Sequence, residues 1–213
     1  MIPIATDNSE AIDTITKYMN HILIDENFLY EDMRNEAAFL LGHINPNKRE
    51  AIEFLTQQFL NKNISEDERC QAAYFMIKID SYNPDAIKFW TDCINQNPNP
   101  NYRFQAAHAL AQIDSDNLIV INTLTELLNL HQSDDSLNIP LLAACQLIEI
   151  EFNHLEAIKF IRKFIQELYK SFSARLMAAN YLGKIILYKQ EAIDVLYNLL
   201  DEIVSNETIE TNQ

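Results

Sequence analysis

Glycine and proline are scarce in this sequence. Its 213 residues include only 2 Gly and 6 Pro, whereas turn-rich β proteins use both residue types freely. There is also no glycine-rich loop of the kind that holds a phosphate, so a P-loop or Rossmann type of nucleotide site is excluded. The scarcity disfavours a β-rich fold and favours helices joined by short turns.

Basic residues are few as well. The chain has 16 Lys and Arg against 31 Asp and Glu, which gives a formal net charge of −15. A chain this acidic is repelled by nucleic-acid phosphates and by anionic lipid surfaces. We therefore expect no nucleic-acid partner and no membrane partner, and we expect its partner to be another protein with a neutral or basic surface.

Cysteines are scattered, and long apolar runs are missing. Cys70, Cys93 and Cys145 form no Cys-x-x-Cys motif, and we interpret them as buried or half-buried thiols in a reducing cytosol. The N-terminus has no basic segment followed by an apolar one, and no apolar run approaches 18 residues. These features predict a cytoplasmic protein without a membrane anchor.

What the sequence does contain is an internal repeat. An alanine pair recurs at 37/38, 72/73, 106/107, 143/144 and 178/179. An isoleucine follows each pair, at Ile44, Ile79, Ile113, Ile150 and Ile185. A second small-then-Ile pair recurs at Ala51/Ile52, Ala86/Ile87, Val120/Ile121, Ala157/Ile158 and Ala192/Ile193. All three series step by 35, 34, 37 and 35 residues, and a period in this range is typical of a solenoid.

The repeat predicts an all-α fold of about 11 helices, with one half repeat followed by five full repeats. Because each repeat contacts only its neighbours, we expect a single domain over residues 1–213. Its expected parts are an N-terminal cap at 1–33, full repeats at 34–68, 69–102, 103–139, 140–174 and 175–205, and a frayed tail at 206–213. The irregular connection at 131–139 is the expected mobile loop or hinge.

Each full repeat should consist of a helix A, which carries the alanine pair, and a helix B. Two alanines at the contact allow close helix packing. Gly42 and Gly183 occupy the same position within helix A, and close helix approach would compensate for their low helix propensity. On helix B, Trp90 and Leu200 belong to apolar columns that should be buried, although a ligand contact is the alternative for Trp90.

An arginine stands three residues before four of the five alanine pairs. These residues are Arg34, Arg69, Arg103 and Arg175, and Pro140 takes the position in the remaining repeat. Each guanidinium should lie between repeats and find acceptors locally. Those acceptors are either neighbouring acidic residues (Asp32, Asp67 and Glu68) or the free carbonyls that end the previous helix B. A structural clamp between repeats is one interpretation, and a functional anion site is the other.

These residues resemble a known family of repeats. The pattern Arg-x-x-Ala-Ala-x-x-Leu-x-x-Ile, a turn, and then Ala-Ile-x-x-Leu is similar to short HEAT-like repeats of the phycobilisome-lyase type. The stretch Gln71-Ala-Ala, Lys78-Ile79-Asp80, Asn83-Pro84, Ala86-Ile87 is especially similar to the HEAT arrays of cyanobacterial NACHT-type ATPases. The resemblance covers roughly Ser9 to Ser205. It implies a right-handed α-solenoid of HEAT-like helical hairpins whose B helices line a concave surface.

Motifs for catalysis are missing. The five histidines include no His-Glu-x-x-His and no pair four residues apart, and there is no Gly-x-Ser-x-Gly. We therefore predict no catalytic, cofactor-binding or metal-binding residues, and we expect the protein not to be an enzyme.

Two exposed surfaces remain as candidates for binding. Rows of polar residues along the B helices suit contact with a protein, and they comprise Glu53, Gln57, Lys88, Asp92, Asn122, Glu126, Lys159, Arg162 and Lys163. An aromatic patch on the A helices would comprise Phe39, Tyr74 and His108.

The sequence favours a non-enzymatic protein-binding scaffold or adaptor that uses the concave helix-B face. The family resemblance implies two alternatives. One is a phycobilin lyase subunit or phycobiliprotein chaperone, and the other is a sensor or regulatory array associated with a NACHT-type ATPase.

Overall fold

A computed structural model describes residues 9–20, 31–44, 49–130, 138–167 and 171–210. These residues form eleven α-helices and one short 3₁₀ helix, and they contain no β-strand, so the predicted all-α fold is confirmed. The helices are α1 (Ser9–Asn20), α2 (Glu31–Ile44), α3 (Arg49–Leu60), α4 (Glu66–Ile79), α5 (Pro84–Gln96), α6 (Pro100–Ala111), α7 (Leu118–Leu128), α8 (Ile139–Ile150), α9 (Leu155–Gln166), α10 (Phe172–Gly183), η1 (Ile186–Tyr188) and α11 (Lys189–Glu210). The helix count agrees with the expected half repeat plus five full repeats.

Helix starts are fixed by short polar residues that the sequence places in the turns. Ser65 and Glu68 form a capping box at α4, in which each side chain accepts from the other residue's backbone N–H. Asn83 accepts from the backbone N–H of Ala86, and Pro84 is the first residue of α5. Asn117 takes the same role one repeat later, where its side chain accepts from Ile119. The short turns therefore need no glycine.

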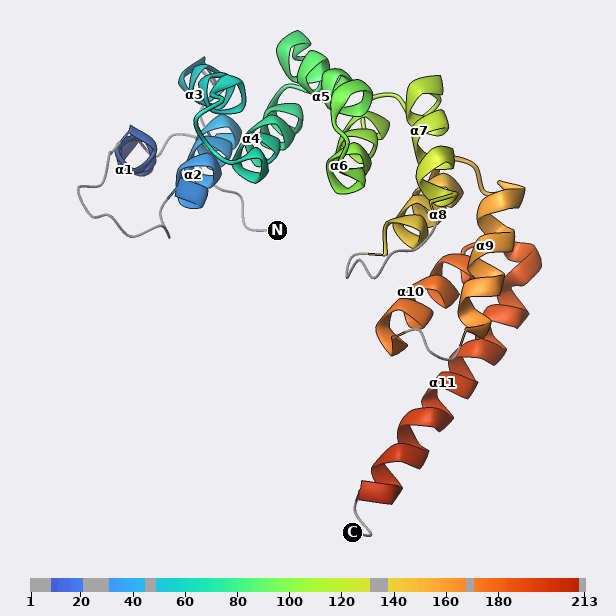
Figure 1. The fold of residues 1–213 in the computed structure, drawn as a ribbon. Helices are drawn as coiled ribbons and strands as arrows, with labels where there is room; N and C mark the ends of the chain where they lie inside the picture. The colour runs from blue at the N-terminus through green and yellow to red at the C-terminus, as the bar shows by residue number, and fades with distance from the viewer. Residues whose placement is uncertain (1–8, 21–30, 45–48, 131–137, 168–170, 211–213) are drawn as a thin grey trace. The chain divides into compact units, whose positions relative to one another are not determined.

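The chain forms two compact units, Met1–Pro98 and Asn99–Gln213. In the first unit, α2 packs against α1, α3 and α4, and α5 packs against α3 and α4. In the second unit, α8 packs against α6, α7, α9 and α10, and α10 packs against α11. Figure 1 shows these helices following one another as neighbouring pairs within each unit. The expected single repeat domain stays a prediction, and most of the expected hinge at 131–139 lies outside the described residues.

The alanine pairs lie inside the packed A helices α2, α4, α6, α8 and α10. All ten of these alanines are buried: Ala37, Ala38, Ala72, Ala73, Ala106, Ala107, Ala143, Ala144, Ala178 and Ala179. Within a unit, each of these helices also packs on the next one of its kind, as α2 does on α4 and α8 does on α10. Small side chains at these contacts allow the helix axes to approach closely.

Gly42 lies at one such close approach. A β-carbon built on Gly42 would lie 2.8 Å from Cγ1 and 3.2 Å from Cγ2 of Ile79, a buried residue of α4. The same addition at Gly183 would meet only the β-carbon of Ala192, at 3.4 Å, which is an ordinary contact. The two glycines share a repeat position, but only Gly42 is held there by a neighbouring helix.

Gly42→Ala should therefore destabilise the fold. Overpacking against Ile79 costs about 1–3 kcal/mol, and the better helix propensity of alanine returns up to about 1 kcal/mol. We expect a net loss of about 1 kcal/mol in the free energy of unfolding, measured by urea denaturation. The matched variant Gly183→Ala should leave it unchanged or slightly higher. Equal effects of the two substitutions would contradict the close approach of α2 and α4.

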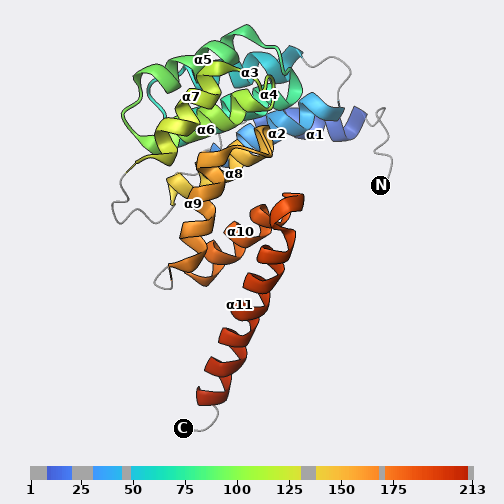
Figure 2. The same ribbon diagram turned by 90° about the vertical axis from the view of Figure 1, so that its right-hand side faces the viewer.

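Two expectations about the C-terminal region differ from the structure. Helix α11 continues to Glu210, so residues 206–210, which the sequence analysis assigned to a frayed tail, are helical in the structure. The segment 189–210 contains no Gly or Pro that would end a helix. Figure 2 shows α11, in red, extending well beyond α10.

Leu200 was expected in the core, but it is 56% exposed, whereas Leu199 is buried. In an earlier repeat the corresponding Ile165 is buried, and its carbonyl accepts from Arg175 of the following helix α10. No described helix follows α11, so none of the described residues covers Leu200 in the same way.

Candidate functional site

The repeated arginines bind the ends of the preceding helices. The Nε atom of Arg34 donates to the carbonyl of Met19 at 3.1 Å, that of Arg69 to Phe59 at 3.0 Å, and that of Arg175 to Ile165 at 3.2 Å. The last carbonyls of an α-helix lack partners within the helix, so these bonds satisfy groups that would otherwise need water. Of the two acceptor types considered from the sequence, the helix-end carbonyls are those that Nε contacts.

Aromatic rings complete two of these arginine sites. The guanidinium carbon of Arg34 lies 5.1 Å from the ring centroid of Phe54, and that of Arg69 lies 5.2 Å from the ring centroid of Phe89. These distances suit cation–π attraction. Phe54 and Phe89 occupy the same position in successive repeats, three residues after the small residue of helix B. This signal was present in the sequence but was missed.

In two repeats one member of this arrangement is replaced by another residue type. At the position of the two phenylalanines the next repeat has Thr123, and there Arg103 forms an ion pair with Glu126, with 2.5 Å between Nη2 and Oε2. In α8 the arginine position holds Pro140, which is buried in the first turn of the helix. The arginine column is therefore not uniform along the chain.

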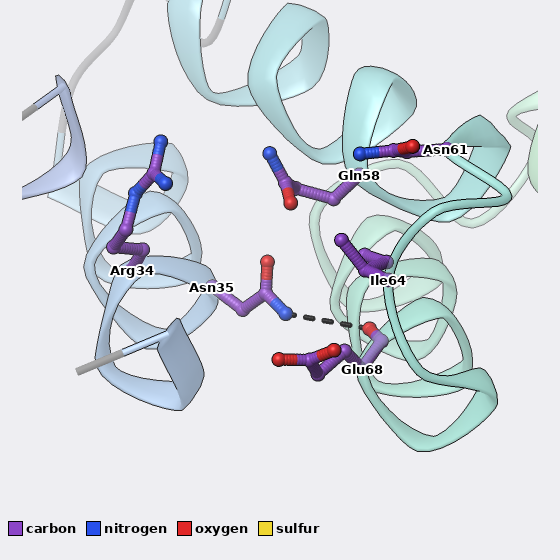
Figure 3. Close-up of a pocket in the computed structure, with 6 residues that line it drawn as sticks. All are labelled: Arg34, Asn35, Gln58, Asn61, Ile64 and Glu68. Carbon is purple, nitrogen blue, oxygen red and sulfur yellow. Dashed lines mark hydrogen bonds between the residues drawn. The ribbon is translucent and has the colours of Figure 1, made fainter. Parts of the chain in front are cut away.

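A pocket of about 240 Å³ opens between α2, the end of α3 and the start of α4. Figure 3 shows the residues that line it, which are Arg34, Asn35, Gln58, Asn61, Ile64 and Glu68. Asn35 is 2% exposed. Its amide nitrogen donates to the carbonyl of Glu68 at 3.3 Å and to Oε1 of Gln71 at 2.9 Å. The sequence interpretation had not identified this pocket.

The three cysteines are free thiols and are buried. The hydrogen bond between Cys70 and Cys93 raises the pKa of Cys70 further than its burial does, and the same bond lowers the pKa of Cys93. Burial raises the pKa of Cys145 to about 12. Protonated thiols at Cys70 and Cys145 are poor nucleophiles, which agrees with the interpretation of these two residues as core side chains.

A polar ladder joins the A helices of the second unit. Gln146 of α8 lies 2.7 Å from Nδ1 of His108 of α6, and Glu149 of α8 accepts from both Tyr181 and Lys184 at 3.0 Å. Burial acts to raise the pKa of Glu149, but these two hydrogen bonds and the charges of Lys184 and His108 together outweigh it and hold the pKa below its usual value. Burial and the bond to Glu149 raise the pKa of Tyr181 to about 12. These groups therefore link neighbouring A helices of the second unit.

The nine polar residues proposed for protein binding are all exposed. Glu53 and Gln57 lie on α3, Lys88 and Asp92 on α5, Asn122 and Glu126 on α7, and Lys159, Arg162 and Lys163 on α9. Three of them form ion pairs, Glu53 with Arg49, Glu126 with Arg103 and Arg162 with Glu191. The other six make no side-chain hydrogen bond or ion pair within the described part of the chain. Between these rows, Thr91 and Thr125 are half-buried and donate to the carbonyls of Ile87 and Ile121 within their own helices.

The aromatic residues Phe39, Tyr74 and His108 are all half-buried. The ring of Phe39 stacks on Phe75, with 4.7 Å between centroids, and the Nζ atom of Lys78 lies 5.1 Å from the ring centroid of Tyr74. His108 belongs to the other unit, where it contacts Gln146 as described above. Each of the three side chains therefore contacts a different neighbour: Phe75, Lys78 or Gln146.

Comparison with known protein families, with curated proteins and with solved structures returned no match for this chain. Among the described residues, His, Cys, Asp and Glu side chains form no group of three or more that could hold a metal ion. No helix in the described ranges combines the length and apolar character needed to cross a bilayer.

Proposed function

We propose that this protein is a non-enzymatic scaffold or adaptor that binds another protein through the exposed faces of its B helices. We further infer that its helix pairs are HEAT-like hairpins of a right-handed α-solenoid. The burial of every alanine pair and the packing of successive A helices within each unit support this repeat architecture. In such an architecture the B helices present parallel rows of side chains to a partner.

The main support for the proposal is that most polar side chains in the rows on the B helices are exposed and make no polar contact with another described residue. Six exposed side chains at matching repeat positions have no intramolecular hydrogen bond or ion pair among the described residues: Gln57, Lys88, Asp92, Asn122, Lys159 and Lys163. Elsewhere in the same repeats, arginines, asparagines and threonines at matching positions are used in packing and capping. Polar groups that are free and regularly spaced can bind a partner without any loss of internal contacts.

The charge of the chain indicates the kind of partner. With a net charge of −15, the molecule attracts basic proteins at long range and does not repel neutral ones. On α9, however, Lys159 and Lys163 form no ion pair with any described residue, although the molecule is acidic. An acidic side chain of the partner would be attracted here, so these lysines would fix the register of the complex.

Charge reversal at the free lysines tests this proposal. The triple variant Lys88→Glu, Lys159→Glu and Lys163→Glu changes exposed groups only, so its thermal stability should match that of the wild type. Affinity capture followed by quantitative mass spectrometry should show a specific partner whose recovery falls at least tenfold with the triple variant. That loss corresponds to about 1.4 kcal/mol of binding free energy.

The matched control is Lys62→Glu, since Lys62 is exposed in the turn between α3 and α4, away from the polar rows. Its recovery of the partner should equal that of the wild type. Equal recovery with the triple variant, for every captured protein, would remove the B-helix rows as the binding surface.

A further inference from the structure

The pocket in Figure 3 lies where the other repeats bury mainly apolar side chains. Two positions define this layer: the one two residues before the alanine pair, and the one seven residues after the small residue of helix B. The successive occupants are Asn35 and Gln58, Cys70 and Cys93, Phe104 and Leu127, Leu141 and Phe164, and Leu176 and Leu199. Both members are buried in the second and fourth of these pairs, and the helix-B member is buried in the third and fifth. Only the first pair consists of two amides, and a pocket is present at that pair.

Burying amides in such a layer costs free energy unless their polar groups are hydrogen-bonded. The nitrogen of Asn35 is satisfied by Glu68 and Gln71. Its oxygen accepts no hydrogen bond from any described residue, although the residue is 2% exposed. In Figure 3 this oxygen faces the space between Arg34 and Gln58.

Other side chains that line the pocket also have polar atoms without a hydrogen-bond partner among the described residues. The side chain of Gln58 makes no hydrogen bond within the described chain, and Asn61 uses only its oxygen, which accepts from the backbone N–H of Asn63. Arg34 donates through Nε to Met19, and its two terminal nitrogens have no hydrogen-bond acceptor among the residues whose side chains the structure describes. Up to three side chains can therefore donate into the pocket, while Asn35 can accept.

The donors and the acceptor in this pocket indicate the chemical class of ligand that it would bind. Donors that include a guanidinium favour a carboxylate, because its two oxygens accept a pair of N–H bonds from the planar guanidinium. The oxygen of Asn35 requires an N–H or O–H donor on the same ligand. The carboxylate of Glu68 accepts from the backbone and hydroxyl of Ser65 at 2.8 and 2.7 Å in the capping box, so this charge is held at the start of α4.

The size of the pocket agrees with a small molecule. A water molecule takes up about 30 Å³ in the liquid, and the pocket of about 240 Å³ thus has room for about eight water-sized groups. We propose that this pocket binds a small carboxylate that carries an N–H or O–H donor on the adjacent carbon, as an α-amino or α-hydroxy acid does. The carboxylate binds Arg34, Gln58 and Asn61, and the adjacent donor binds Oδ1 of Asn35. This site is independent of the protein-binding surface proposed above.

The experiment titrates the full chain with L-alanine and L-lactate and follows amide chemical shifts by NMR. Acetate lacks the adjacent donor and L-alaninamide lacks the carboxylate, so these two probes serve as ligand controls. We expect saturable shifts at residues around the pocket for L-alanine or L-lactate, with at least tenfold weaker binding of both controls. No saturable shift with L-alanine or L-lactate at 50-fold excess would overturn the proposal, as would equal binding of acetate.

Two variants separate binding from folding. Asn35→Leu with Gln58→Leu gives the pocket the apolar pattern of the later repeats, so it should fold and should lose binding by more than tenfold. If this double variant does not fold, Gln58→Leu alone provides the same test at a half-buried position. Arg34→Lys should weaken binding about tenfold, because lysine lacks the planar fork.

Arg69→Lys is the matched control for Arg34→Lys. Arg69 makes the same type of carbonyl and aromatic contacts, but in a repeat whose layer is filled by Cys70 and Cys93. Binding of L-alanine or L-lactate should be unchanged in this variant. Equal weakening by Arg34→Lys and Arg69→Lys would overturn the assignment of the ligand to the Figure 3 pocket.

Discussion

Trp90→Ala should lower the free energy of unfolding by about 3–5 kcal/mol, the usual cost of truncating a large buried aromatic side chain. Trp90 is 1% exposed and meets the ring of Phe89 edge-on, with 5.1 Å between ring centroids. The substitution therefore leaves a cavity in the first unit. Urea denaturation followed by far-UV circular dichroism measures the effect.

Trp90→Phe tests what the indole N–H contributes to stability, apart from the packing of the ring. The indole Nε1 of Trp90 is buried without a hydrogen-bond partner among the described residues, so phenylalanine removes an unsatisfied donor at the cost of a smaller ring. We expect this variant to stay within about 1 kcal/mol of the wild type, since the two effects oppose each other. A Trp90→Ala variant with unchanged stability would instead place this side chain outside the core.

Arg175→Met should destabilise the fold by about 1–3 kcal/mol, because it leaves the carbonyl of Ile165 without its donor in a buried setting. Arg175 is 7% exposed, and its Nε donates to that carbonyl at 3.2 Å. Methionine keeps most of the apolar stem, so the loss reports mainly on the polar contact. The midpoint of urea unfolding gives the measurement.

The matched control for Arg175→Met is Arg49→Met. Arg49 forms an exposed ion pair with Glu53 within α3, and its side chain is 78% exposed. Pairs of this kind contribute little to stability, so we expect no measurable change. If the arginine column served as an anion site and not as a clamp, Arg175→Met would leave the unfolding midpoint unchanged as well.

The repeat period explains why so much of the helical architecture could be predicted. Alanine pairs and isoleucines recur in one register, and helix packing requires small and apolar residues at fixed spacing. The helix count and the burial of all ten paired alanines follow from this register. Turns could also be located, because Asn83 with Pro84 forms a recognisable helix start.

What the sequence left open depends on neighbouring helices. Arg69 could have paired with acidic side chains or with helix-end carbonyls. Which of the two it contacts depends on how close α3 lies, and this distance cannot be inferred from the local sequence. Leu200 matches the buried template, but its burial needs a following helix. The role of Gly42 similarly depends on the position of Ile79 in another helix.

The pocket was missed for a different reason. Asn35 and Gln58 are individually ordinary polar residues, and they become unusual only when they are compared with Leu141, Phe164 and Leu199 at matching positions. That comparison needs the knowledge that the two positions face each other across helices A and B. The aromatic partners of Arg34 and Arg69 were missed for a similar reason, because the sequence alone does not show that Phe54 and Phe89 lie next to these arginines.

The stacking of one helical hairpin on the next is tested most directly by the contact between Gly42 and Ile79. In a ¹³C-edited NOE spectrum of the intact chain, we expect a strong cross-peak between an α-proton of Gly42 and the δ-methyl group of Ile79. Both residues would be assigned independently beforehand. Absence of that cross-peak, with both resonances assigned and sharp, would contradict the packing of α2 on α4 and with it the repeat architecture.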